Sequence, residues 1–159
     1  MGYYIRILSP IKGNVTLEII YNCLRNKKIN FSIEHDLESK KLNNKNWKQT
    51  IFFYSKNKQP ILLNRDIANQ KGNLVKEEVK EFLDEIKNLP VTKKKKEIES
   101  RLKRTKQIFS FQIPTSDIDD SGWNLVDTII DILVEKSKGF VQVDREGFYI
   151  DKKLVLKIK

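Results

Sequence analysis

The side chains in this sequence that are most able to do chemistry are cations packed closely together in the stretch TKKKKEIESRLKR, residues 92–104. Its seven cationic residues are Lys93, Lys94, Lys95, Lys96, Arg101, Lys103 and Arg104. Clustered cations on one exposed element can contact several phosphates and release the counterions of a nucleic acid. The same cluster is also typical of a solvated helix surface, because Lys is abundant throughout this chain.

Charge is distributed unevenly along the sequence. The net charge is +10, yet residues 91–110 hold eight Lys or Arg against two Glu, while residues 111–159 hold seven against nine Asp or Glu. Asp127, Asp131 and Glu135 recur at i, i+4 and i+8, which places three like charges on one face of a helix. Two hypotheses remain open: the basic segment neutralises this acidic stripe within the fold, or the stripe is offered to a partner.

Two further residues could suggest catalysis. His35, the only His, is close in sequence to Asp36 and Glu38, but the spacing matches no metal-ligand pattern. Cys23, the only Cys, could form a dyad with His35 only if the fold joined them, and a small core residue is the ordinary explanation of its place beside Leu24. Neither residue therefore predicts an enzyme.

Carboxylates raise the possibility of a cation site. Asp117, Asp119 and Asp120 could hold a divalent ion with Asp144 and Glu146. Helix capping explains the first three without a metal, and turn chemistry explains Asp144. The six Gly residues are too scattered for a phosphate-binding loop or a dinucleotide fingerprint. We therefore expect no metal and no cofactor, and a role other than catalysis.

Hydrophobic periodicity predicts one α+β domain over residues 1–159. The expected strands are 3–8, 29–35, 49–54, 60–64, 106–113, 140–144, 148–150 and 154–158, and the expected helices are 16–27, 74–89, 92–104 and 122–137. We expect a largely antiparallel sheet with the helices 16–27, 74–89 and 122–137 packed on one face. Because strand, helix and paired strands follow one another in both halves, a pseudo-repeat of strand, helix, strand and strand is possible.

Aromatic residues beside the basic segment bear on nucleic-acid binding. Phe109 and Phe111 lie on the expected strand 106–113, and aromatic side chains on a sheet can stack on RNA bases. They alternate with Ser110 and Gln112, however, so in a sheet with one wet face they point into the core. The sequence also lacks the glycines of the RNA-binding strand motif.

Four segments, MGYYIRIL, IFSFQI, DSGWNLVDTII and GFVQVDREGFYI, together resemble an uncharacterised bacterial protein family of similar length with no assigned activity. The resemblance covers most of the chain and includes no catalytic signature. It implies a bacterial, single-domain, cytoplasmic protein and assigns no functional residue. By analogy with other small families of this kind, it suggests an immunity-like or anti-defence role.

Composition completes the functional expectation. A single Cys fits a reducing compartment, and no apolar run approaches the roughly 20 residues that span a bilayer, so we expect a cytoplasmic protein that does not enter membranes. The favoured function is a non-enzymatic macromolecular interaction protein with a protein partner. The alternative is a nucleic-acid-binding protein that uses the basic helix 92–104. The expected contact surfaces are that helix or the turn 144–147.

Overall fold

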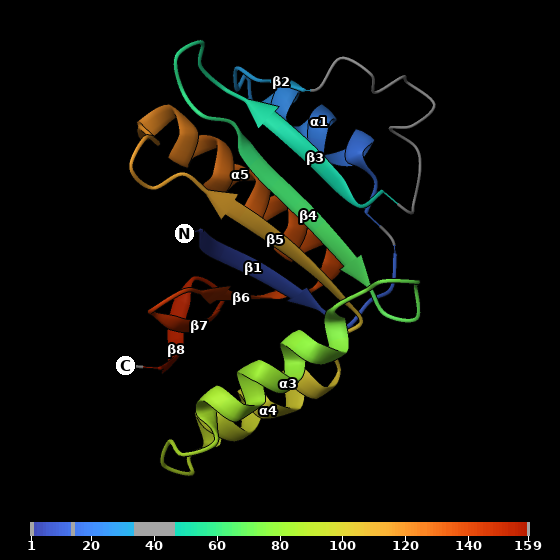
Figure 1. Ribbon diagram of the computed structural model, residues 1–159, viewed down its shortest axis with the longest axis vertical. Coiled ribbons are helices and arrows are strands. Elements are labelled where there is room, and N and C mark those ends of the chain that lie inside the picture. Colours follow the sequence, from blue (N-terminus) through green and yellow to red (C-terminus); the bar gives the residue numbers. More distant parts are fainter. Residues whose placement is uncertain (1, 14, 34–46, 159) are drawn as a thin grey trace.

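The computed structural model describes residues 2–13, 15–33 and 47–158, and all eight strands of this part of the chain join one antiparallel sheet (Figure 1). The strand order is β2-β3-β4-β5-β1-β6-β7-β8. The strands are β1 Tyr3–Ser9, β2 Ser32–Ile33, β3 Gln49–Phe53, β4 Ile61–Ile67, β5 Gln107–Ile113, β6 Phe140–Val143, β7 Gly147–Ile150 and β8 Lys153–Lys157. The helices are α1 Leu17–Asn26, α3 Val75–Ile86, α4 Lys93–Lys103 and α5 Asp120–Ser137.

The centre of the sheet is the antiparallel pair β1 and β5, which runs in register from Tyr3 opposite Ile113 to Ser9 opposite Gln107. Side chains alternate across a strand, so Ile7 and Phe109 project from the same face and are fully buried. The amphipathic helices α1 and α5 pack together on this face (Figure 1). This arrangement forms the larger hydrophobic core.

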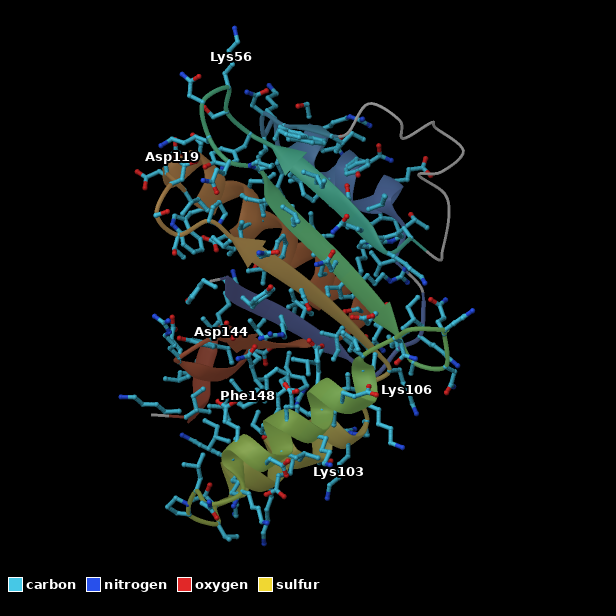
Figure 2. All side chains as sticks on the ribbon, in the orientation of Figure 1. Lys56, Lys103, Lys106, Asp119, Asp144 and Phe148 are labelled. Atoms are coloured by element: carbon cyan, nitrogen blue, oxygen red, sulfur yellow. The ribbon has the colours of Figure 1, made fainter. Side chains whose placement is uncertain are left out.

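The opposite face holds a second core at one end of the sheet. Leu8 and Ile108 are adjacent in sequence to Ile7 and Phe109, so they project to the other side, where the hairpin of α3 and α4 covers them together with Phe148 (Figure 2). The helix expected at 74–89, now α3, was predicted to share a face with the other two helices. Its different position follows from apolar residues on both faces of the central strands.

Other features of the predicted fold can be compared directly. The α+β class and the antiparallel sheet are confirmed. Each half of the chain has the element order strand, helix and three strands. In the sheet, however, β5 lies beside β4, the last strand of the first half, whereas β1 lies beside β6, the second strand of the second half. The two halves therefore do not occupy equivalent positions in the sheet. Of the strand predicted at 29–35, residues 32–33 are in β2, and its last two residues lie outside the described part.

The longest helix, α5, positions the acidic stripe. Asp119 caps its start, because one carboxylate oxygen accepts a hydrogen bond from the backbone N–H of Gly122 at 3.1 Å. Its apolar side, which includes Leu125, Ile129 and Leu133, is fully buried in the larger core. None of the helices in the described part of the chain combines the length and apolar character needed to cross a bilayer.

Candidate functional site

The basic segment forms α4, whose N-terminus is capped by a side chain. The Thr92 side chain accepts a hydrogen bond from the backbone N–H of Lys95 at 3.1 Å. Ile98 and Leu102 are fully buried in the second core, and α4 packs against α3 and β8. A narrow apolar stripe is therefore enough to hold this highly charged helix on the body of the protein.

One predicted contact residue, Lys95, faces inward. The residue is 6% exposed, and its Nζ donates to the carbonyl oxygens of Leu89 at 2.8 Å and Lys87 at 3.0 Å. These carbonyls follow the end of α3, where backbone acceptors lack helical partners. Lys95 therefore joins the two helices of the hairpin, and a role in contacting phosphate is wrong for this residue because its ammonium is already buried and bonded.

The remaining cations of α4 fall into two groups. Arg101 is half-buried, forms an ion pair with Glu97 at 3.3 Å and lies over the ring of Phe140. Exposed positions hold the others, which are Lys93, Lys94, Lys96, Lys103 and Arg104. Figure 2 shows Lys103 pointing away from the sheet. Five of the seven predicted cations are thus on the surface.

The aromatic residues beside α4 do not extend this basic surface. Phe109 and Phe111 are fully buried in the core beneath α1 and α5, as their alternation with Ser110 and Gln112 predicted. The described part of the chain therefore presents no stacking platform at these two positions.

The acidic stripe lies on α5, on the other face of the sheet from α4. The ion pair that the structure gives it joins Asp131 to Lys152, in the turn between β7 and β8, at 3.5 Å. Both side chains are largely exposed, so this pair stabilises the fold little. Among the described residues, no ion pair links the stripe to α4, which means that the first of the two hypotheses, neutralisation by the basic helix, has no support from these contacts.

A groove of about 890 Å³ runs beside this stripe, between α5 and the face of β6 and β7. Half-buried apolar and aromatic side chains line it, and all of them pack against the larger core: Tyr3, Trp123, Ile130, Val134, Val141 and Tyr149. Among its described lining residues are five carboxylates and one cation, which are Asp127, Asp131, Glu135, Glu146, Asp151 and Lys152. We call this feature the acidic groove. It is an apolar surface with a negative rim on a protein whose net charge is +10.

Glu146 organises one end of the acidic groove. One carboxylate oxygen accepts a hydrogen bond from the hydroxyl of Tyr3 at 3.1 Å, and the other accepts one from the hydroxyl of Tyr149. Burial and the charge of Glu146 raise the pKa of Tyr3 to about 12, and the hydrogen bond to Glu146 is the main cause of the raised pKa of Tyr149. One carboxylate therefore links the two aromatic side chains.

Asp127 lies near the middle of the groove rim. Partial removal from water raises its pKa above the usual range, the nearby Asp131 raises it further, and Lys152 lowers it. Negative charge at this position is therefore only partly compensated within the fold. A cation brought into the groove by a partner would favour the ionised form.

A second cavity, of about 620 Å³, lies near Arg6 on the opposite face of the sheet. The Arg6 guanidinium donates from Nη1 to Gln142 at 2.8 Å and to Asp144 at 2.9 Å, and its Nε lies 3.5 Å from a carboxylate oxygen of Glu78 on α3. The ring of Phe82 stacks near the same guanidinium. Because these contacts join β1, β6 and α3, we interpret the cluster as a structural link.

The predicted carboxylate group is not brought together. Asp119 caps α5, and Asp117 accepts a hydrogen bond from the backbone N–H of Gln59, while Asp144 lies at the far end of β6 (Figure 2). Within the described ranges, no group of three or more His, Cys, Asp or Glu residues could hold a metal ion.

The remaining chemical candidates are Cys23 and the His35 group. Cys23 is a half-buried free thiol on α1. His35, Asp36 and Glu38 lie outside the described residues.

Comparisons of the chain with protein-family models, with curated proteins and with solved structures found no match. The resemblance to an uncharacterised bacterial family therefore stays a prediction. Among the described residues, the acidic groove is the most distinctive surface feature.

Proposed function

We propose that this protein is a non-enzymatic interaction module that binds a basic and apolar segment of another protein in the acidic groove. The observation that carries this proposal is the apolar surface beside α5, rimmed by carboxylates that the basic helix does not neutralise. Exposed apolar surface with a polar rim is typical of a protein-binding site. Carboxylates around it favour partners with Lys or Arg and discourage acidic ones.

The turn expected to contact a partner supports this proposal in a changed form. Asp144 hydrogen-bonds Arg6 and the backbone of Tyr4, so its carboxylate is engaged within the fold. Glu146, two residues later, lines the acidic groove and positions its two Tyr rings. In this proposal the turn acts through the groove rather than as a separate contact surface.

Peptides that differ only in charge sign test the proposal. One labelled peptide contains Lys, Leu and Ala in scrambled order, and its counterpart has Glu in place of Lys. We expect the basic peptide to bind, the acidic peptide not to bind, and binding to weaken as salt increases. Equal binding of both peptides would contradict the proposal.

A matched pair of protein variants locates the binding. The groove variant carries Asp127→Asn, Asp131→Asn and Glu135→Gln. The control variant removes the same charge from the α3–α4 hairpin through Glu77→Gln, Asp84→Asn and Glu99→Gln. We expect the groove variant to lose its binding of the basic peptide and the control variant to keep it. Equal loss in the two variants would mean that overall charge, and not the groove, determines binding.

Nucleic-acid binding through α4 is the second candidate function. It is favoured by the five exposed cations of α4 and by their position away from the acidic stripe. A salt series of polarisation measurements on mixed DNA and RNA, with Lys93, Lys94 and Lys96 changed to Ser, tests it. Binding that falls in this variant, and in the Lys103→Ser variant, would support the second candidate. No binding at low salt would reject it.

A further inference from the structure

We infer that the partner segment bound in the acidic groove is a cationic amphipathic α-helix that lies alongside α5. This inference rests on the proposed function and specifies the conformation and the charge pattern of the partner. Three features of the groove support this inference. On the face of the larger core no described helix covers β6 and β7, the strands of the groove floor are hydrogen-bonded on both sides, and the carboxylates on α5 are four residues apart.

The helical layer on the larger core is incomplete. On this face α1 packs on β3 and β4, where its Tyr21 hydroxyl bonds the Thr50 hydroxyl at 2.6 Å, and α5 packs next to α1 and on β1. Helices pack roughly 8–10 Å apart and strands about 4.8 Å apart, so each helix covers about two strands. Among the described elements, none continues this layer behind β7 and β8 (Figure 1). A further helix on β6 and β7 would lie in the acidic groove.

The floor of the groove favours a helix over an extended segment. β6 is hydrogen-bonded to β1 on one side and to β7 on the other, and β7 is hydrogen-bonded to β8. The floor therefore offers no free strand edge, and a segment that lies on it cannot add a strand to the sheet. An extended segment would bury backbone groups against Val141 and Tyr149 without partners, whereas a helix satisfies its own backbone hydrogen bonds.

The carboxylates supply the expected charge pattern. Asp127, Asp131 and Glu135 follow one flank of α5 at intervals of four residues, so they span roughly 12 Å at 1.5 Å per residue. A neighbouring helix with Lys or Arg at the same interval would bring one cation to each carboxylate. Its apolar side would then contact Trp123, Ile130 and Val134, which line the same groove.

Two peptides of identical composition test the inference. Both contain Leu, Lys and Ala in equal amounts and have about the length of α5. In the helix-patterned peptide Leu and Lys recur at intervals of three and four residues, and in the strand-patterned peptide they alternate. Binding is followed by the fluorescence of Trp123, with Trp123→Phe to assign the signal, and peptide helicity is followed by circular dichroism.

We expect the helix-patterned peptide to bind at least about tenfold more tightly, to gain helicity on binding, and to lose affinity in the groove variant but not in the control variant. Equal binding of the two peptides, or binding of the helix-patterned peptide without a gain in helicity, would overturn the helix inference. If the groove variant abolished binding in that case, the proposed function would still stand. Failure of both peptides to bind, or binding that the groove variant leaves unchanged, would overturn the proposed function itself.

Discussion

The Nζ atom of Lys95 lies 2.8 Å from the carbonyl oxygen of Leu89, so a residue from the most basic stretch of the sequence caps the end of the preceding helix. A second carbonyl, that of Lys87, accepts from the same ammonium. Lys95 is 6% exposed, whereas its neighbours Lys94 and Lys96 are at exposed positions. The four consecutive lysines therefore do not form one uniform surface.

The first prediction concerns the Lys95→Met variant. Methionine fills similar space but cannot donate, so two carbonyls near the end of α3 lose a charged partner. We expect the free energy of unfolding to fall by about 1–3 kcal/mol, measured by urea denaturation. The control is Lys94→Met, which should change it by less than about 0.5 kcal/mol because that side chain is exposed. Equal effects of the two variants would show that the cap does not stabilise the hairpin.

The second prediction concerns the link between Arg6 and Glu78. In Arg6→Met, the carboxylates of Glu78 and Asp144 lose a half-buried cation. We expect the free energy of unfolding to fall by about 2–3 kcal/mol near neutral pH. Arg104→Met, at an exposed position, serves as the control and should have little effect. A similar loss in both variants would contradict a specific role for the Arg6 cluster.

The loss of stability in Arg6→Met should depend on pH. Burial raises the pKa of Glu78 above its ordinary 4.5, and the charge of Arg6 partly opposes the rise. The proton on the Glu78 carboxyl stabilises the folded protein, and this contribution is fully present below the ordinary pKa. It is lost as the pH rises through the raised pKa. Removing Arg6 raises the pKa of Glu78 further. The loss in free energy of unfolding caused by Arg6→Met should therefore be smaller at about pH 5 than at about pH 8. Adding Glu78→Gln should remove most of this difference.

Local spacing predicted much of this fold because the decisive signals were short-range. Thr92 caps α4, and Phe109 and Phe111 point into the core because they alternate with polar residues. The burial of Lys95 was missed, although it lies at i, i+3 and i+7 with Ile98 and Leu102 and so belongs to the same helical stripe. Its residue type suggested water, but the free carbonyls of α3 supplied a partner that the sequence pattern does not display.

The acidic groove could be predicted only in part. The stripe on α5 was visible because Asp127 and Asp131 are four residues apart on one helix. Its apolar floor was not, because Tyr3 and Tyr149 come from opposite ends of the chain and meet only through the pairing of β1, β6 and β7. Long-range strand order therefore determines which surface the carboxylates border. Besides the stripe, the half-buried Trp123 on α5 was a local signal for this site.

The third prediction concerns Asp127→Asn. Partial removal from water and the nearby Asp131 raise the pKa of Asp127, so its ionised form destabilises the folded protein near neutral pH. We expect the free energy of unfolding to rise by about 0.2–0.5 kcal/mol at low salt in this variant. The gain should disappear below the ordinary pKa of 3.8, where the carboxyl is neutral in both the folded and the unfolded protein. Asp131→Asn relieves the same repulsion but loses Lys152, so its gain should be smaller. A loss of stability in Asp127→Asn would contradict this account.

The fourth prediction concerns the turn that carries Glu146 into the groove. Gly147 follows Glu146 with φ at +141°, and a Cβ at this position would lie 2.0 Å from the backbone carbonyl oxygen of Leu156 on β8. Only glycine fits without moving β7 away from β8. We therefore expect Gly147→Ala to destabilise the fold by more than about 2 kcal/mol and to weaken the hydrogen bonds that Tyr3 and Tyr149 donate to Glu146.

Gly72→Ala is the matched control for this prediction. Gly72 also has a positive φ, of +77°, but a Cβ there would meet nothing within 4 Å. The cost should therefore be limited to backbone strain, about 1 kcal/mol. Thermal unfolding measures the two losses. Alkaline titration should show the pKa of Tyr3 falling below about 12 in Gly147→Ala alone, because only that substitution moves Glu146, whose charge and hydrogen bond add to the effect of burial on this pKa. Equal losses with an unchanged Tyr3 pKa would mean that the close approach of Gly147 to β8 does not position the groove.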